Sequence, residues 1–169
     1  LRTQPRYVQR ISGDLLYYQR IPLAQFGAPV DVVLLEDILR CPAKYKMVIF
    51  LNAVKDKPEL RQAIQALRDN GAKMVFTYGT GFLDDQGIST KTLSENVGME
   101  MAEAGEGSLK ILFDREKEQE AGQPYTVKTR FKVVDKEATP LARYVSSGEV
   151  AVAEKNGAYF YGTTDLDRE

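Results

Sequence analysis

The stretch that most constrains this chain runs from Lys46 to Gly81 and reads KMVIFLNAVKDKPELRQAIQALRDNGAKMVFTYGTG. Met47 to Leu51 is an unbroken apolar run, which predicts a strand covered on both faces, as in a parallel sheet. Lys73 to Tyr78 predicts a second strand. A helix between them would complete a βαβ unit with parallel strands and a right-handed crossover.

The residues between these strands carry the signals of an amphipathic helix. Asp56 is the expected N-cap, because a carboxylate there can accept the free N–H groups of the first turn. Leu60, Ile64 and Leu67 recur at helical spacing. Gly71 is expected to end the helix, since glycine readily adopts a positive φ. We therefore expect the βαβ unit to form the centre of the fold.

The rest of the chain gives weaker signals. Helices are expected over residues 12–26, with a kink or break at Pro22, and over residues 91–97. Residues 102–108 are expected to be weakly structured. Strands are expected at 30–35, 109–113, 127–133, 141–146, 150–154 and 158–161, the last two forming a hairpin about Asn156-Gly157. The pattern predicts an α/β first half and a β-rich last third.

Length and composition limit the possible functions. A chain of 169 residues is expected to be one domain, and its net charge of −1 offers nothing for nucleic acid or an anionic membrane. No apolar run approaches the roughly 20 residues that span a bilayer. The start at Leu1 and the helix-start pattern TTDLDRE at the end favour a fragment of a larger multidomain protein. Composition does not distinguish a cytoplasmic from a periplasmic or secreted location.

The lack of histidine excludes much catalytic chemistry. It removes the Ser-His-Asp and Cys-His triads and the histidine-containing zinc sites. The single cysteine, Cys41, cannot form an intramolecular disulfide and has no histidine to activate it. The carboxylate pairs at 84–85 and 36–37 lie on expected loops, where solvated side chains are the simpler interpretation. The sequence predicts no catalytic residue, no metal site and no cofactor.

One turn is a candidate for ligand binding. Gly79-Thr80-Gly81 follows a core strand, and ligands of open α/β sheets bind beyond the carboxyl ends of strands. Thr80 has a hydroxyl that can bind an anion or acyl oxygen, and Asn52 leaves the preceding strand at the same edge. The candidate ligand residues are therefore Asn52, Gly79, Thr80 and Gly81. An ordinary strand-exit turn is the simpler alternative.

Aromatic residues gather toward both ends of the sequence. Tyrosine-rich surfaces are common in interfaces, although packing within the domain explains the same residues. The residues are Tyr17, Tyr18, Phe26, Tyr159, Phe160 and Tyr161.

Four runs resemble a known family. They are LLYYQRIPLAQFGAPVDVVLLEDIL, KYKMVIFLNA and LRDNGAKMVFTYGTGFL, and DKEATPLARYVSSGEVAVAEKNGAYFYGTTDL follows in the same order. Together they are similar to the middle, "trimerisation" domain of glycoside hydrolase family 42 β-galactosidases. That resemblance implies a class I glutamine amidotransferase-like, flavodoxin-like three-layer sandwich with a mostly parallel sheet.

The resemblance also implies a role. In that family the catalytic carboxylates lie on a separate TIM barrel, and the middle domain contributes subunit contacts. Enzymes of the same fold keep a nucleophilic cysteine in the turn that here reads Gly79-Thr80-Gly81, so amidotransferase activity does not carry over. The family also has a central strand before the LLYYQR helix, and Arg6 to Val8 match it poorly.

These observations favour a non-catalytic scaffold or oligomerisation domain of a β-galactosidase-like glycoside hydrolase. Its expected partners are the catalytic TIM barrel and further copies of the chain, with neither nucleic acid nor a membrane. A domain that binds a small ligand or carbohydrate is the first alternative. A stand-alone amidotransferase-like hydrolase is the second.

Overall fold

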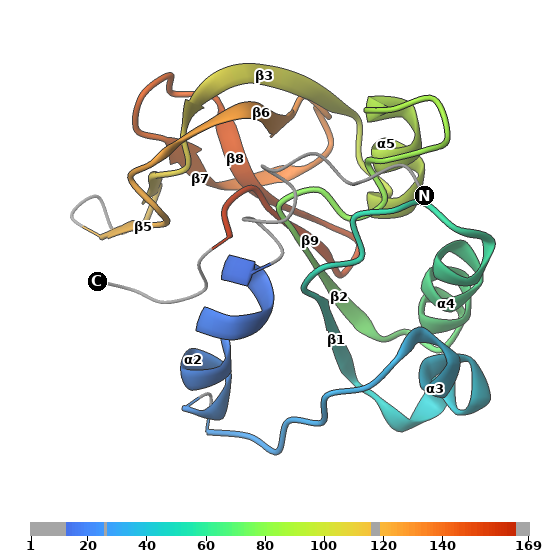
Figure 1. Ribbon diagram of the computed structural model, residues 1–169. Coiled ribbons are helices and arrows are strands. Elements are labelled where there is room, and N and C mark those ends of the chain that lie inside the picture. The colour runs from blue at the N-terminus through green and yellow to red at the C-terminus, as the bar shows by residue number, and fades with distance from the viewer. Residues whose placement is uncertain (1–12, 26, 116–118, 165–169) are drawn as a thin grey trace.

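The computed structural model describes residues 13–25, 27–115 and 119–164 (Figure 1). The helical elements are the π-helix η1 (Asp14–Tyr18), α2 (Arg20–Ala24), α3 (Leu35–Arg40), the 3-10 helix η2 (Pro42–Lys44), α4 (Pro58–Asp69) and α5 (Thr90–Val97). The strands are β1 (Met47–Phe50), β2 (Lys73–Thr77), β3 (Met101–Ser108), β4 (Ile111–Phe113), β5 (Glu120–Ala121), β6 (Thr126–Val133), β7 (Thr139–Tyr144), β8 (Val150–Lys155) and β9 (Ala158–Tyr161).

Seven strands form the main sheet, in the order β1-β2-β9-β8-β7-β4-β5. β3 and β6 form a separate antiparallel ribbon. Figure 1 shows this ribbon arching over β7 and β8, with α4 and α5 along one side of the parallel strands and α2 on the other. β1 therefore lies at one outer edge of the sheet.

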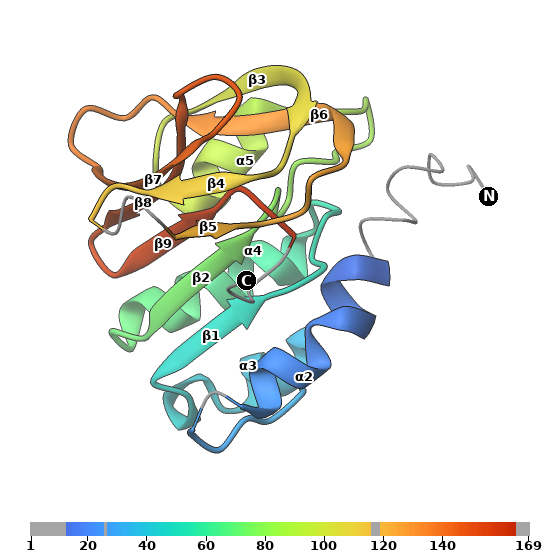
Figure 2. The same cartoon turned by 90° about the vertical axis from the view of Figure 1, so that its left-hand side faces the viewer.

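The expectation of a mostly parallel three-layer sandwich is wrong. Only β1, β2 and β9 run parallel, and every other neighbouring pair in the main sheet is antiparallel. The described residues are richer in strand (34%) than in helix (26%), and the mixed sheet curls into a half-barrel (Figure 2). The physical reason lies after α5, where the described chain has no further helix. Successive strands there are joined by turns and loops, and the hairpins that tight turns make are antiparallel.

The predicted βαβ unit is confirmed, with one change at its helix. β1 and β2 pair in parallel, and α4 buries Leu60, Ile64 and Leu67. Gly71 follows α4 with φ 68°, as expected. The N-cap residue is Lys57 rather than Asp56. The Asp56 carboxylate instead accepts hydrogen bonds from the Arg61 guanidinium one turn further along.

Three other predictions have different outcomes. The hairpin of β8 and β9 is confirmed, and Asn156 and Gly157 both have the positive φ that its tight turn requires. The predicted strand at 30–35 is wrong, because residues 28–33 pair with no other described backbone group and α3 begins at Leu35. Residues 102–108, expected to be weakly structured, lie within β3.

The helix expected over residues 12–26 is divided in two at Gln19, between η1 and α2. The proline expected to break it, Pro22, lies in the first turn of α2. Proline has no N–H and crowds the preceding turn, which accounts for a break just before it. Phe26 lies outside the described residues, as does the helix start expected at the C-terminus.

A buried arginine holds the β3–β6 ribbon in place. The Arg130 side chain donates to four backbone carbonyls of β3 at 3.2 to 3.4 Å, those of Ala104, Gly105, Glu106 and Ser108. It also donates to Ser146 Oγ at 3.0 Å and lies 4.6 Å from the centre of the Tyr144 ring. Burial in this apolar setting raises the pKa of the Tyr144 hydroxyl. These bonds explain how a segment without an apolar pattern becomes a strand.

Candidate functional site

The turn that follows β2 is the first candidate site. Tyr78 takes a left-handed backbone conformation with φ 56°, which is uncommon for a bulky residue. Its N–H donates to Tyr161 O at 2.7 Å, and its hydroxyl donates to Thr129 O at 2.5 Å. The strain of this conformation is therefore offset by bonds to β9 and β6.

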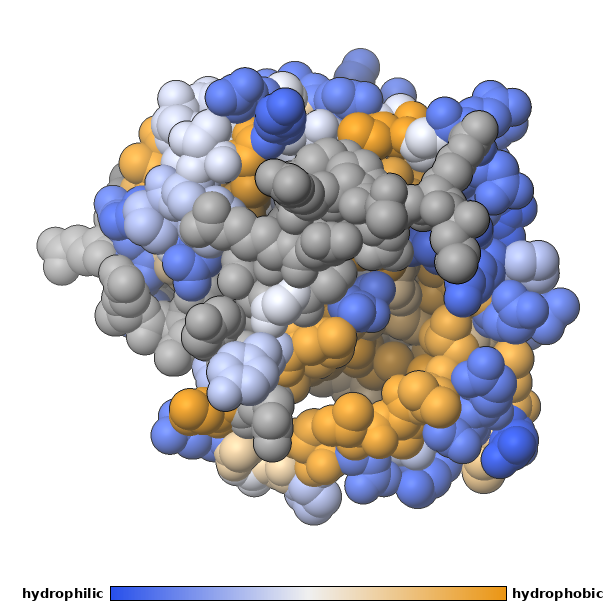
Figure 3. All heavy atoms as spheres, in the orientation of Figure 1, coloured by the Kyte–Doolittle hydropathy of each residue, from blue (hydrophilic) through white to orange (hydrophobic). Residues whose placement is uncertain are grey.

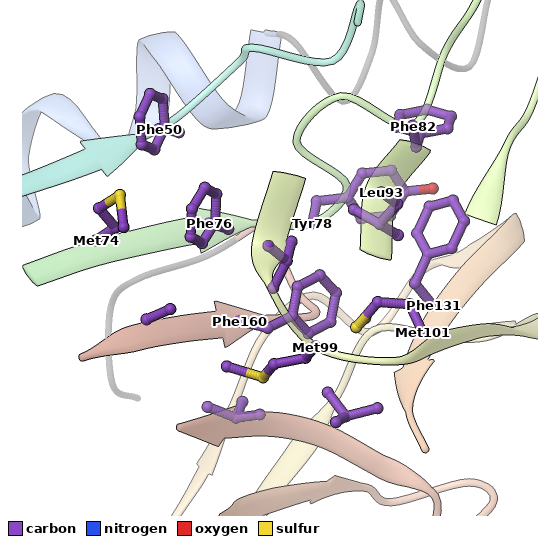
Figure 4. Packing of buried hydrophobic residues seen from close by; sticks show 14 of the residues in the cluster. Phe50, Met74, Phe76, Tyr78, Phe82, Leu93, Met99, Met101, Phe131 and Phe160 are labelled. Carbon is purple, nitrogen blue, oxygen red and sulfur yellow. The ribbon is translucent and has the colours of Figure 1, made fainter. Parts of the chain in front are cut away.

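Aromatic packing encloses this turn. The rings of Tyr78, Phe82 and Phe131 lie 5.1 to 5.9 Å apart, centre to centre (Figure 4). A Cβ on Gly79 would lie 2.7 Å from Phe82 and 2.9 Å from Phe131, and one on Gly81 would lie 2.1 Å from Asn96 Nδ2. The two glycines are thus required by the protein's own packing.

The predicted ligand residues are brought to one end of the parallel strands. Gly81 N donates to Ala53 O at 2.7 Å, which joins the turn after β2 to the segment that follows Asn52. Thr80 is buried, and its hydroxyl has no hydrogen-bond partner among the described residues. Asn52 is half-buried. Ligand binding by Asn52, Gly79, Thr80 and Gly81 stays a prediction.

A polar cavity of about 420 Å³ lies beside this turn, lined by Asp56, Pro58, Arg61, Asp84 and Asp85. Asn96 Nδ2 donates to Asp56 Oδ1 at 3.1 Å, and Arg61 Nε donates to the same oxygen at 3.0 Å. The bond from Arg61 is the main cause that lowers the pKa of the Asp56 carboxyl. Asp56 is therefore a stable anion that is already paired.

The carboxylates of Asp84 and Asp85, which line this cavity, interact with groups of neighbouring loop segments. Asp84 Oδ1 accepts N–H groups from Gln86 and Gly87, so it stabilises its own turn. Asp85 is exposed and lies 3.5 Å from Lys55 Nζ. Of the other pair, Asp37 accepts the Leu34 N–H at the start of α3. These bonds fit the solvated-loop interpretation for Asp84 and Asp85, but the loop expected at 36–37 is wrong, because Glu36 and Asp37 lie in the first turn of α3.

A second cavity, of about 550 Å³, opens between the C-terminal ends of α4 and α5 and the hairpin turn, beside Arg68 and Gly98. Arg68 donates to Asn96 O at 2.8 Å in the last turn of α5. Partial burial lowers the pKa of this guanidinium. A cation at a helix C-terminus is stabilised by the free carbonyls, which explains Arg68 without any ligand.

The outer edge of β1 is the third candidate, and sequence reasoning missed it. Ten large apolar side chains are exposed in the described residues, and seven belong to this region. We call these seven the open-edge surface: Leu16, Tyr17, Ile21, Val30, Val32, Leu34 and Met47. Figure 3 shows hydrophobic atoms around a hollow between α2, the segment leading to α3, and β1. Two sequence signals lie in this region: Tyr17 among the aromatic residues considered for an interface, and the strand-like run at 30–35, which pairs with no described strand.

Metal and membrane features are lacking in the parts of the chain that the structure describes. There, no group of three or more His, Cys, Asp or Glu side chains is placed to bind a metal ion. No helix in residues 13–25, 27–115 and 119–164 is long and apolar enough to cross a bilayer. Cys41 is exposed and unbonded to sulfur.

Comparisons with known proteins give no family. No protein-family model matches the chain, and no curated protein is similar enough to match it. The resemblance to the middle domain of family 42 β-galactosidases therefore stays a prediction.

Proposed function

We propose that this chain is a non-catalytic module that makes contacts between polypeptides in a larger carbohydrate-active protein. The observation that carries this proposal is the open-edge surface, which gathers most of the exposed large apolar side chains beside one sheet edge. Val32 alone is 92% exposed. Contiguous apolar surface of this kind marks protein–protein contacts in soluble proteins. The glycoside hydrolase context rests on the sequence resemblance alone.

The state of the strand-exit turn supports a non-catalytic role. Thr80 stands where enzymes of the resembled fold carry a nucleophile, and its hydroxyl is buried. The sequence contains no histidine to activate it. Catalysis would need a base and access for substrate at the same place.

Light scattering after size-exclusion chromatography tests the contact role. We expect the chain to self-associate as concentration rises, and Val32→Lys to weaken that association. Val145→Lys is the matched control, because Val145 is also an exposed valine but follows β7, away from the open-edge surface. A chain that stays monomeric at every concentration, or a control that weakens association equally, would contradict the oligomer contact.

A second candidate function is binding of a small ligand or carbohydrate. The observation that favours it is the polar cavity at Asp56 and Arg61, which lies beside the predicted turn. A thermal-shift screen with monosaccharides tests this candidate, with Arg61→Ala as the variant and the exposed Arg40→Ala as its control. No sugar-dependent rise in melting temperature, or an equal rise in both variants, would rule it out.

A further inference from the structure

The cavity beside Arg68 lies at the opposite end of the parallel strands from the turn after β2 (Figure 2). Its walls are the C-terminal ends of α4 and α5, the start of β2 and the turn of the β8–β9 hairpin. Its volume of about 550 Å³ is within the range of small-molecule sites, roughly 300 to 1,000 Å³. A Cβ at Gly71 or at Gly157 would meet no atom within 4 Å, so the backbone of both turns faces open space.

The side chains that line this cavity carry positive charge only. Arg68, Lys73 and Lys155 are basic, and no other described residue that lines the cavity is charged. The charge of Lys155 is already matched, because its Nζ lies 2.8 Å from Asp135 and 2.9 Å from Glu137. Arg68 and Lys73 form no ion pair with a described residue. The cavity therefore has positive charges that no described carboxylate balances.

The Arg68 guanidinium is the most informative of these groups. Its Nη2 donates to Asn96 O at 2.8 Å, which fixes the side chain without a ligand but brings no negative charge to it. Burial lowers the pKa of this guanidinium, and no described carboxylate acts against that effect. A Cβ at Gly98 would lie 2.9 Å from Nη2, so the glycine leaves the room that this cation occupies. A half-buried cation without a counter-ion attracts an anion more strongly than an exposed one does.

The helix ends that face this cavity have their acceptor groups occupied. The free carbonyls of a helix C-terminus carry partial negative charge and would repel an anion. Here donors of the protein itself bind them, and this reduces the repulsion. The carbonyls that accept such bonds are those of Ala66, Leu67, Arg68, Ser94 and Asn96.

We propose that this cavity binds the oxyanion group of a small molecule, a phosphate or a carboxylate, between Arg68 and Lys73. The planar guanidinium has parallel N–H groups that match two oxygens of such a group, and the lysine ammonium adds a second charge. The site is separate from the open-edge surface and from the polar cavity at Asp56. It therefore goes beyond the proposed function and does not depend on it.

Titration with inorganic phosphate, followed by two-dimensional NMR of nitrogen-15-labelled protein, tests the site. Succinate replaces phosphate in a second titration, and sodium chloride at the same ionic strength is the reference for both. We expect the amide signals of Gly71, Gly98 and Gly157 to shift and to saturate, while those of Gly13 and Gly148, which do not line the cavity, stay in place. The anion that saturates these shifts at the lower concentration identifies the group as phosphate or carboxylate.

Two variants assign the binding to the basic side chains. Lys73→Gln removes one exposed charge and should raise the Kd about threefold, as expected for one exposed ion pair. Lys128→Gln is its control, because Lys128 is also an exposed lysine of a strand but lies on β6, outside the cavity. Arg68→Gln keeps a donor for Asn96 O and removes the charge, so we expect the shifts no longer to saturate.

Three outcomes would overturn the inference. Shifts that grow linearly with both anions and equal those in sodium chloride would indicate charge screening alone. Equal weakening by Lys73→Gln and Lys128→Gln would indicate attraction to the whole surface. Saturable binding that persists in Arg68→Gln would place the anion elsewhere. None of these outcomes affects the contact function, because association of the chain is measured separately.

Discussion

The exit of β2 and the outer edge of β1 belong to the same parallel part of the sheet. Side chains cover the exit of β2, whereas the edge of β1 is left open. At the exit of β2, Phe82 and Phe131 pack against Gly79, and Thr80 is buried. At the edge of β1, Met47 is exposed, as is Val32 in the segment leading to α3. The exit of β2, where enzymes of the resembled fold carry a nucleophile, is filled by side chains. The outer edge of β1, where a sheet could continue, is exposed in the described residues.

The two regions differ in how much they contribute to the stability of the fold. The β3–β6 ribbon is the cover of the closed end, since it supplies both Phe131 and Arg130. The edge of β1 has no comparable cover among the described residues. Substitutions at the closed end should therefore affect folding, and those at the open edge should affect association.

Arg130→Met should have the largest effect. It removes the buried guanidinium that four backbone carbonyls of β3 share as a donor, and we expect it to reduce the free energy of unfolding by about 4 kcal/mol. Urea unfolding followed by circular dichroism measures this loss. The free energy of unfolding of Arg130→Lys should lie between those of the unchanged protein and Arg130→Met, because lysine keeps the charge but offers fewer donors. A loss below about 1 kcal/mol for Arg130→Met would mean that the ribbon does not depend on this residue.

Gly81→Ala should come next. Its Cβ would lie 2.1 Å from Asn96 Nδ2, and φ at this position is 71°. Steric overlap and backbone strain together should cost about 3 kcal/mol in the same unfolding measurement. Gly13→Ala is the control, because a Cβ there meets nothing within 4 Å. Equal stability of the two variants would show that the closed end has room to adjust.

Acid should weaken the opposite end of these strands through Asp135, whose partner Lys155 pairs with Ala158 beside the hairpin turn. The Lys155 ammonium, 2.8 Å away, is the main cause that lowers the pKa of this carboxyl to about 2 from 3.8. Because the folded pKa is the lower one, the pair stabilises the fold fully above pH 3.8, and this contribution is lost as the pH falls toward 2. We expect Asp135→Asn to be less stable near neutral pH and to lose less stability over that range. Urea midpoints at several pH values would show parallel acid limbs if the pair contributes nothing.

Val32→Lys should have the smallest effect on folding. A side chain 92% exposed makes few contacts, so the free energy of unfolding should change by less than about 0.5 kcal/mol. Binding of a dye that fluoresces on apolar surfaces should nevertheless fall. A large loss of stability would mean that the open edge is part of the folded core, and the comparison of the two regions would fail.

Local patterns in the sequence were sufficient for two parts of the fold. The apolar run at Met47 and the spacing of Leu60, Ile64 and Leu67 identify β1 and α4, because each pattern reflects burial along one element. Asn156-Gly157 identifies the β8–β9 hairpin, because few residues tolerate that turn. These signals need no knowledge of distant partners.

The remaining features depend on contacts distant in sequence. Met101–Ser108 has no apolar alternation and becomes a strand by pairing with β6 around Arg130. Residues 30–35 are mostly apolar, as a buried strand would be, but no described strand pairs with them and Leu35 begins α3. For the candidate site, the glycines located the turn correctly. Its burial depends on Asn96 and Phe131, which no local pattern links to it.

The position of β9 has a consequence for how the protein folds. β9 is the last described strand, and it lies between β2 and β8. One side of β2 is therefore without a neighbour until nearly all of the described chain has been synthesised. Pairings this distant in sequence are slow to form, because a long loop must close before any bond is made. We expect the parallel and antiparallel halves to join only after translation of Ala158–Tyr161, and a chain that stops before β9 to expose two sheet edges instead of one continuous sheet.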